Sequence, residues 1–306
     1  MPVERTWRPG RPVPVGLVLS TLRRGTGDPT YVGRGDTVWR GLRTPHGTAS
    51  LVLCADRAAG SVRARAWGDG AQWACEHVPA MLGGGDDPSG FVPRHPLLVA
   101  ALRRHRYWRV PRSGLVFEAL VAATIEQRVI GPEAFTGWRR LVRRHGEPAP
   151  GPPGDRGLMV LPTPATVRRI PSWEWLAMHV DAARSTTVVR AACVAESLER
   201  TLELPPEAAE DALASIPGVG VWTVAEVRQR AHGDADAVSF GDYHLASSVG
   251  HALTGAAVDD RGMAALLEPY RPHRYRVQRL VELSGVRAPR RGAKMPPRRH
   301  LPGSRV

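Results

Sequence analysis

The chain has 306 residues, a formal net charge of +13 and a sequence pI of about 11.0. This length gives room for one large domain or two to three small ones, and the positive excess favours a polyanionic partner such as nucleic acid. The three scattered cysteines form no CxxC pair, and there is neither a signal peptide nor an apolar run long enough to cross a bilayer. These features argue against zinc, iron–sulfur, disulfide-stapled, secreted and membrane proteins, and predict a cytoplasmic location.

The N-terminal part, residues 1–90, is rich in glycine and in short segments of strand-like pattern. The predicted strands are residues 16–19, 37–42, 49–54 and 61–67. We expect one helix over residues 71–81 to lie on the sheet that these strands form. A glycine-rich break at residues 83–88 then ends this part of the chain.

The pattern from residue 97 to about 285 is helical, with one proline- and glycine-rich interruption at residues 148–164. The last residues, 287–306, contain seven Arg or Lys and no acidic residue, and this composition is typical of a disordered basic tail. We therefore predict three parts, at residues 1–90, 91–286 and 287–306.

A glycine hairpin, Pro217-Gly218-Val219-Gly220, lies between helices predicted at residues 205–215 and 221–230. Proline fixes φ, and the glycines permit positive φ or close backbone approach. The unpaired N–H groups in the first turn of the second helix suit a phosphate. The same pattern also fits an ordinary helix-turn-helix corner whose glycines allow tight packing.

An isolated acid, Asp242, follows the connector at residues 235–240 and precedes a helix predicted to run through residue 251. Aspartate at this place is the expected N-cap of that helix. By itself it indicates a cap and nothing more.

Taken together, these segments resemble the helix-hairpin-helix DNA glycosylases, and within them the bacterial 3-methyladenine DNA glycosylase II type. The pattern L-P-G-[IV]-G-x-W-T-A, followed further on by an aspartate and an aromatic residue, is matched by IPGVGVWTV at residues 216–224 and by Asp242-Tyr243. Two flanking segments also match, FEALVAATIEQRV at residues 117–129 and RPHRY at residues 271–275.

The resemblance implies an α+β protein, with an N-terminal antiparallel β-sheet domain followed by a two-lobed, all-helical helix-hairpin-helix glycosylase domain. The active-site cleft lies between the lobes. It also implies a monomeric, nucleoid-associated DNA repair enzyme that binds double-stranded DNA containing a damaged base. No cofactor is required in such an enzyme, and no iron–sulfur cluster is expected.

By the same resemblance, Asp242 is the catalytic carboxylate, and Trp222 and Tyr243 are walls of the base pocket. A carboxylate near C1′ stabilises the oxocarbenium charge or deprotonates a water, while the flipped base is held by stacking. Core packing is the alternative role for the two aromatic residues. Bifunctional relatives carry a Schiff-base lysine at the Trp222 position. Because Lys294 is the single lysine of this chain, we expect no strand cleavage.

Contacts to DNA are implied for the main chain of Gly218, Gly220 and Thr223 and for the side chains of Gln127 and Arg128. The implied ligands of a structural monovalent cation that bridges to DNA are the main-chain carbonyls of Ala214, Ile216 and Val219.

Three positions depart from the resembled pattern. Glu226 and Glu282 stand where relatives carry aromatic residues of the stacking wall. Their carboxylates either meet a base amino group or a cationic alkylpurine in the pocket, or are exposed and paired with nearby arginines. Arg128 stands where relatives carry a wedge leucine. It either fills the gap left by a flipped nucleotide or is a surface charge.

The sequence thus predicts a monofunctional DNA base-excision glycosylase that hydrolyses the N-glycosidic bond of a damaged base, above all an alkylated purine, and leaves an abasic site. Two alternatives stay open. One is a helix-hairpin-helix DNA-binding protein that has lost catalysis, and the other is a glycosylase for a deaminated or oxidised base.

Overall fold

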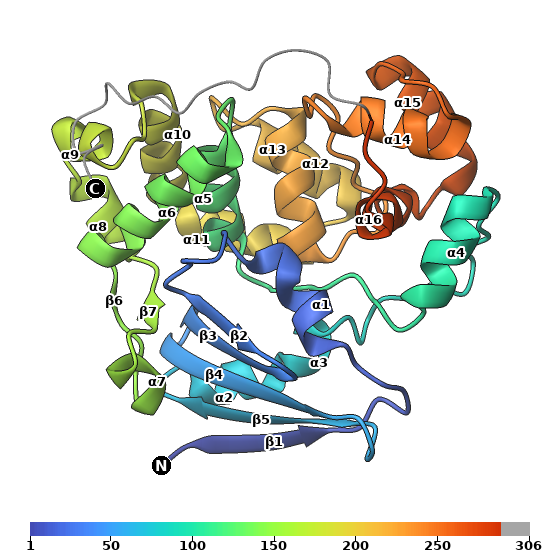
Figure 1. Cartoon of the computed structure of the whole chain (residues 1–306). Coiled ribbons are helices and arrows are strands. Elements are labelled where there is room, and N and C mark those ends of the chain that lie inside the picture. The colour runs from blue at the N-terminus through green and yellow to red at the C-terminus, as the bar shows by residue number, and fades with distance from the viewer. Residues whose placement is uncertain (289–306) are drawn as a thin grey trace.

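An antiparallel sheet forms one end of the computed structural model, which describes residues 1–288 (Figure 1). The strand order is β1-β5-β4-β3-β2, and each neighbouring pair is antiparallel. In β5, Val62 and Ala64 are buried while Arg63 and Arg65 are exposed, so one face of the strand packs on the core. The strands are β1 (Val3–Trp7), β2 (Tyr31–Arg34), β3 (Thr37–Thr44), β4 (Gly47–Asp56) and β5 (Ser61–Trp67).

The strand predicted at residues 16–19 is wrong, because this segment is a helix, α1 (Val15–Leu19). Val15, Val18 and Leu19 are buried at helical spacing, and α1 packs on β3 and β4. A short apolar run carries too few periods to separate a strand from a buried helix. A 3₁₀ turn, η1 (Ser20–Leu22), continues α1.

The single helix predicted over residues 71–81 is two short helices, α2 (Ala71–Glu76) and α3 (Val78–Met81), which meet at His77. Helix α2 packs against β1, β4 and β5. The core between sheet and helices also contains Tyr275, which belongs to the last helix of residues 1–288. The sheet is therefore joined to the helical part through a shared core.

The helices form two groups above the sheet, and each group has its own core (Figure 1). Each group consists of helices that follow one another in sequence, except that α4 belongs to the second group because it packs against α16. The first group is α5 (Val116–Glu126), α6 (Gly131–His145), α8 (Pro164–Arg169), α9 (Ser172–Ala177), α10 (Ala182–Cys193), α11 (Ala195–Arg200), α12 (Pro206–Ala214) and α13 (Val221–Val227). The second is α4 (Pro96–Arg104), α14 (Leu245–Thr254), α15 (Asp260–Leu267) and α16 (Arg274–Ser284).

The proline- and glycine-rich interruption at residues 148–164 lies in a small ribbon beside the sheet. Strands β6 (Glu147–Pro148) and β7 (Met159–Val160) pair around the short helix α7 (Pro152–Asp155). From residue 289 on, the predicted basic tail lies outside the described residues. Among the helices that are described, none combines the length and the apolar character that a bilayer crossing requires.

A half-buried histidine lies at the end of the hairpin helix, where α13 continues into a π-helical turn, η3 (Arg228–His232). Burial, and then the charges of Arg112 and Arg228, lower the pKa of His232 to about 4. Its Nε2 lies 3.0 Å from the hydroxyl of Thr201. In the unfolded chain the ring titrates at its ordinary 6.5 and takes up a proton more readily than in the fold.

Protonation of His232 therefore does not reduce the free energy of unfolding above about pH 6.5, and reduces it progressively as the pH falls toward 4. The expected loss from this one group is roughly 3 kcal/mol in the free energy of unfolding. Urea unfolding of the parent and of His232→Asn at pH 7 and pH 4.5 measures it, and the variant should lose less stability between the two. An equal loss in both proteins would show that another group governs the acid limit.

Candidate active site

The glycine hairpin is held against helix α5 by one glutamine. Gln127, the residue after α5, donates from Nε2 to the carbonyl of Gly218 at 3.0 Å and to the Oγ1 of Thr223 at 2.8 Å. The amide of Val219 donates to the carbonyl of Ile216 at 2.9 Å and closes the turn. Gln127 thus positions the hairpin, a role that the sequence did not indicate.

The two glycines of the hairpin meet different needs. Gly218 has a φ of +98°, and a Cβ there would lie 2.0 Å from the Oγ1 of Thr187. Gly220 has a φ of −102°, and nothing lies within 4 Å of a Cβ built on it. Only Gly218 therefore requires glycine for its conformation and packing. At Gly220 the missing side chain leaves the main chain open to a large group.

Asp242 is half-buried, and both of its carboxylate oxygens accept hydrogen bonds. Oδ1 accepts from the amide of His244, the N-cap residue of α14, at 2.8 Å and from that of Leu245, its first residue, at 2.9 Å. Oδ2 accepts from the indole Nε1 of Trp222 at 3.3 Å, across 20 residues of sequence. One oxygen thus bonds to the start of α14, and the other faces the hairpin helix.

The two predicted aromatic wall residues lie in different surroundings. Trp222 is half-buried and packs against the core of the first helical group. Tyr243 lies on the surface with 90% of its side chain exposed, and its ring meets that of His244 edge-on at 4.8 Å. The alternative role of Tyr243, packing in the hydrophobic core, is therefore wrong.

Arg128 is exposed and has a left-handed backbone with a φ of +54°. Few residues other than glycine adopt this conformation, and those that do often mark functional turns. Because Arg128 directly follows Gln127, its backbone lies beside the hairpin.

A cavity of about 240 Å³ lies where η1, α5, α6, α13 with η3, and α16 meet. Its lining combines arginines, carboxylates and amides with two aromatic rings. The lining residues are Ser20, Thr21, Arg23, Arg24, Glu126, Phe135, Glu226, Gln229, Arg230, Tyr275, Gln278, Arg279 and Glu282.

Both glutamates that depart from the resembled pattern line this cavity. Glu226 is only 7% exposed, so the surface-charge alternative is wrong for it. It accepts from the Oγ of Ser239 at 2.7 Å and pairs with Arg230 at 2.7 Å. Burial is the largest single influence on Arg230 and lowers its pKa, but Glu226, Tyr275, Glu126 and Glu282 together outweigh it, so the pKa is raised. Glu282 is more exposed and pairs with Arg279 at 2.8 Å.

The cavity and the Asp242 carboxylate are linked by one helix face. Trp222, which contacts Asp242, and Glu226, which lines the cavity, are one helical turn apart on α13. That separation is about 6 Å along the helix axis.

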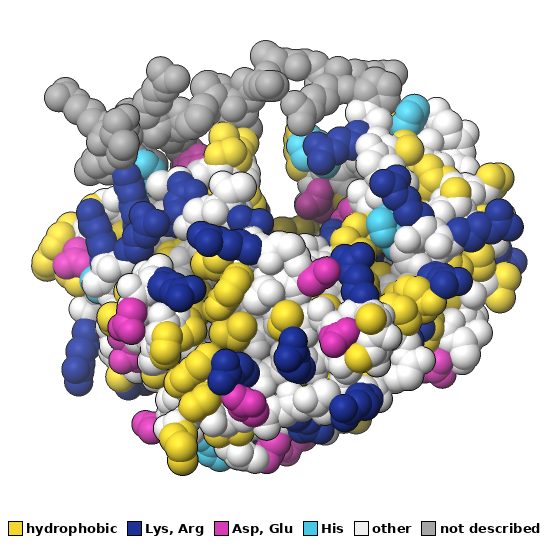
Figure 2. All heavy atoms as spheres, turned by 60° about the horizontal axis from the view of Figure 1, so that its bottom comes forward, with side chains coloured by type: hydrophobic (Ala, Val, Ile, Leu, Met, Phe, Trp, Pro, Cys, Tyr) yellow, Lys and Arg dark blue, Asp and Glu magenta, His cyan; other side chains and the backbone are white. Residues whose placement is uncertain are grey.

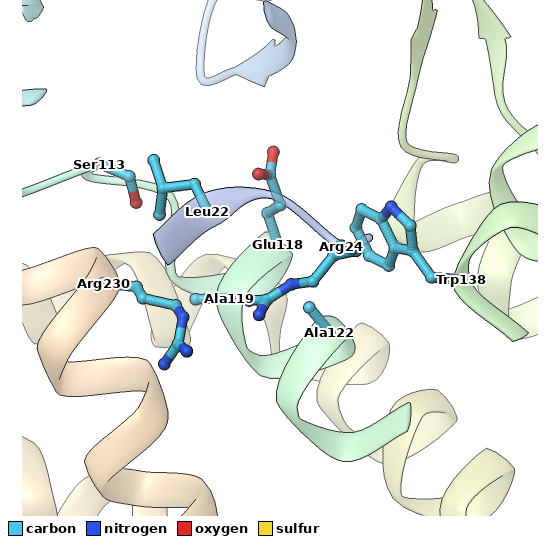
Figure 3. Close-up of a pocket in the computed structure, with 8 residues that line it drawn as sticks. All are labelled: Leu22, Arg24, Ser113, Glu118, Ala119, Ala122, Trp138 and Arg230. Carbon is cyan, nitrogen blue, oxygen red and sulfur yellow. The ribbon is translucent and has the colours of Figure 1, made fainter. Parts of the chain in front are cut away.

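A smaller cavity of about 10 Å³ lies next to the first and shares Arg24 and Arg230 with it (Figure 3). Figure 3 shows both side chains beside α5, where Ala119 and Ala122 leave room for them. A space of this size holds at most a single water.

The outer surface is hollowed on the side that Figure 2 presents. Basic side chains stand on both sides of the hollow, and an acidic side chain lies within it. Such a charge distribution suits a polyanion that bridges the two sides.

Most residues of the cavity could not be predicted from the sequence. Tyr275 lay inside the matched RPHRY segment, so its position could have indicated a role. Arg24, Phe135 and Arg279 carried no local signal, because only the packing of distant segments brings them together.

No protein-family model and no curated protein matches the chain in sequence. Solved structures do match its fold. A 3-methyladenine DNA-glycosylase from Archaeoglobus fulgidus aligns with a TM-score of 0.73 and 16% identity, over 92% of this chain and 97% of that one. MBOgg1, solved with a low-affinity DNA ligand, aligns with a TM-score of 0.71 and 14% identity, over 92% and 95%.

An 8-oxoguanine glycosylase/lyase from Clostridium acetobutylicum, bound to double-stranded DNA with cytosine opposite 8-oxoguanine, aligns with a TM-score of 0.69 and 12% identity. It covers 92% of this chain and 96% of that one. The chain thus shares its fold, an antiparallel sheet followed by a helical part, with these three DNA glycosylases. The predicted fold class is confirmed.

Proposed function

We propose that the chain is a DNA base-excision glycosylase, which turns a damaged base out of the duplex and hydrolyses its N-glycosidic bond. One observation carries the proposal: the hairpin helix contacts the Asp242 carboxylate through Trp222 and, one turn further on, lines a cavity of about 240 Å³ with Glu226. A cavity of this volume suits a single heterocyclic base. A protein that only binds duplex DNA has no need of such a cavity beside a carboxylate.

The chemistry follows from the position of Asp242. As the bond between C1′ and the base breaks, positive charge develops on the deoxyribose, and a nearby carboxylate stabilises it. The same group can accept the proton of the attacking water. The hydrogen bonds from His244, Leu245 and Trp222 hold the carboxylate in one orientation during this step.

The hairpin is the proposed anchor for the DNA backbone. Its exposed main chain at Gly220 and the first turn of α13, which includes the amide of Thr223, would bind a phosphate. Arg128 lies next to this surface and would fill the space of the flipped nucleotide.

The monovalent cation implied by the resemblance fits the turn in donor chemistry. The carbonyls of Ala214, Ile216 and Val219 come from one short segment. The carbonyl oxygen of Ile216 accepts a single hydrogen bond within the turn, so one of its lone pairs remains for a cation. When bound, the ion would link these carbonyls to a DNA phosphate.

We further propose that the enzyme lacks lyase activity, since Trp222 occupies the position of a Schiff-base lysine. Duplexes with one alkylated, oxidised or deaminated base should yield strands that break at the lesion only after hot alkali. Gel electrophoresis with and without alkali measures this. Breakage without alkali, or a covalent protein–DNA adduct trapped by borohydride, would contradict it.

The lesion class expected from sequence was an alkylated purine. The solved structures that share the fold comprise both a 3-methyladenine and an 8-oxoguanine glycosylase. Because the shared fold occurs with both alkylated and oxidised substrates, the lesion class has to be inferred from the residues that line the cavity.

A further inference from the structure

The cavity contains one more positive than negative side chain. Each of its glutamates is already paired with an arginine. The three pairs are Arg24 with Glu126 at 3.1 Å, Arg230 with Glu226 at 2.7 Å, and Arg279 with Glu282 at 2.8 Å.

The fourth arginine, Arg23, supplies the excess charge. Its guanidinium donates to the carbonyls of Gly25 and Thr26 and lies over the ring of Tyr31. These partners are uncharged, so they leave its positive charge uncompensated. A cationic alkylpurine entering the cavity meets an excess of like charge and no unpaired carboxylate.

Stacking surface in the cavity is sparse. Phe135 and Tyr275 are its only aromatic lining residues within the described chain. Polar side chains, among them Gln229 and Gln278, form the rest of the lining. An apolar box that would hold a methylated cation by its faces is therefore not formed here.

The hydroxyl of Tyr275 is the available polar group of this lining. The side chain is 2% exposed, and the charges of Arg230, Arg279, Glu282 and Glu226 all act on its hydroxyl. Among residues 1–288, no hydrogen bond is formed by this hydroxyl. Burial raises its pKa to about 12, so the group is a neutral donor and acceptor at physiological pH. A ligand that covers this hydroxyl without hydrogen-bonding to it leaves the hydroxyl buried without a partner, and the cavity therefore discriminates against such a ligand.

Resting on the function proposed above, we infer that the cavity selects a neutral purine that has gained a ring carbonyl and the adjacent N–H, and that Tyr275 reads this lactam edge. Oxidation at C8 and deamination at C6 or C2 both create such an edge. Guanidinium and hydroxyl donors suit the new carbonyl, while glutamate and amide oxygens suit the new N–H.

The excess of positive charge in the cavity also favours the release of such a base from the sugar. The bond between C1′ and N9 breaks with its electron pair going to the base, while the water oxygen bonds to C1′ and Asp242 takes the water proton. A neutral oxopurine then leaves as an anion delocalised onto its carbonyl, and later takes a proton from solvent. The positive cavity stabilises this anion, whereas an alkylpurine leaves already neutral.

Single-turnover base release from matched duplexes tests the inference. The lesions are 8-oxoguanine, hypoxanthine, xanthine and 7-methylguanine, and the proteins are the parent, Tyr275→Phe and the control Tyr107→Phe, whose ring stacks with Arg106 away from the cavity. The parent should release at least one oxopurine faster than 7-methylguanine. Tyr275→Phe should slow that release about tenfold or more, as loss of a hydrogen bond to a buried polar group predicts. Tyr107→Phe should match the parent.

Because the Tyr275 hydroxyl bonds to no described residue, Tyr275→Phe should melt at the temperature of the parent, which separates recognition from folding. Preference for 8-oxoguanine or for the deaminated bases identifies the source of the lactam edge. Faster release of 7-methylguanine than of every oxopurine, or an unchanged lesion ranking in Tyr275→Phe, overturns the inference and leaves the glycosylase proposal standing. Release of no base at all overturns both.

Discussion

Replacing Asp242 with asparagine is expected to slow base release by about three orders of magnitude and to leave duplex affinity unchanged. The amide keeps an oxygen that can accept from His244 and Leu245, so the start of α14 stays capped. It loses the negative charge that the proposed mechanism places near the sugar, and it cannot accept a proton from water. Single-turnover release and fluorescence anisotropy with a labelled duplex measure the two effects separately.

A second aspartate at the start of a helix offers a matched control. Asp259 is exposed and accepts from the amide of Gly262 at 2.8 Å at the start of α15. Asp259→Asn should release base at the rate of the parent. If Asp242→Asn also keeps that rate, Asp242 only holds the start of α14 and the catalytic group lies elsewhere.

Replacing Gly220 with valine is expected to weaken binding to every duplex sequence alike, by about tenfold to a hundredfold if one or two hydrogen bonds to a phosphate are blocked. The backbone at Gly220 tolerates a side chain, and the space in front of it is open. The valine thus obstructs the DNA without disturbing the fold. Gly85→Val is the control, because Gly85 is also exposed and has open space around it.

Gly218→Val should act differently. A side chain there meets the Thr187 hydroxyl and forces a strained φ, so the melting temperature should fall together with affinity. Loss of binding in Gly220→Val that depends on duplex sequence would indicate base reading by the hairpin. Unchanged affinity would show that the hairpin does not hold the backbone.

The parts of the site that are local in sequence were predictable. Gly218 marks a turn that needs positive φ, and the step from Trp222 to Glu226 places both on one helix face. Asp242 was predicted as the N-cap of the following helix; the N-cap position is taken by His244, although Asp242 accepts from the amide of Leu245, the first residue of α14. Its contact with Trp222 depends on a turn across 20 residues, which no local pattern encodes.

The errors in secondary structure have local causes, whereas those at the site come from the packing of distant segments. Residues 16–19 form too short an apolar run to show a period, and β1 was missed because it is an edge strand whose Glu4, Arg5 and Thr6 are exposed. The cavity was beyond reach, since η1, α5, α6, α13 with η3, and α16 supply its lining. Pairing of Glu226 with Arg230 was considered on the surface, yet the pair is buried because α16 and η1 cover it.

The most direct test of the central claim is detection of the free base itself. The full chain and Asp242→Asn are incubated with duplexes that carry one damaged purine each, and the small-molecule fraction is analysed by mass spectrometry. The account predicts free damaged base from the parent, in equal amount to alkali-labile sites in the strand, and far less from the variant. Tight duplex binding by the parent without release of any base would contradict it, and would identify the protein as a binder that performs no glycosidic cleavage.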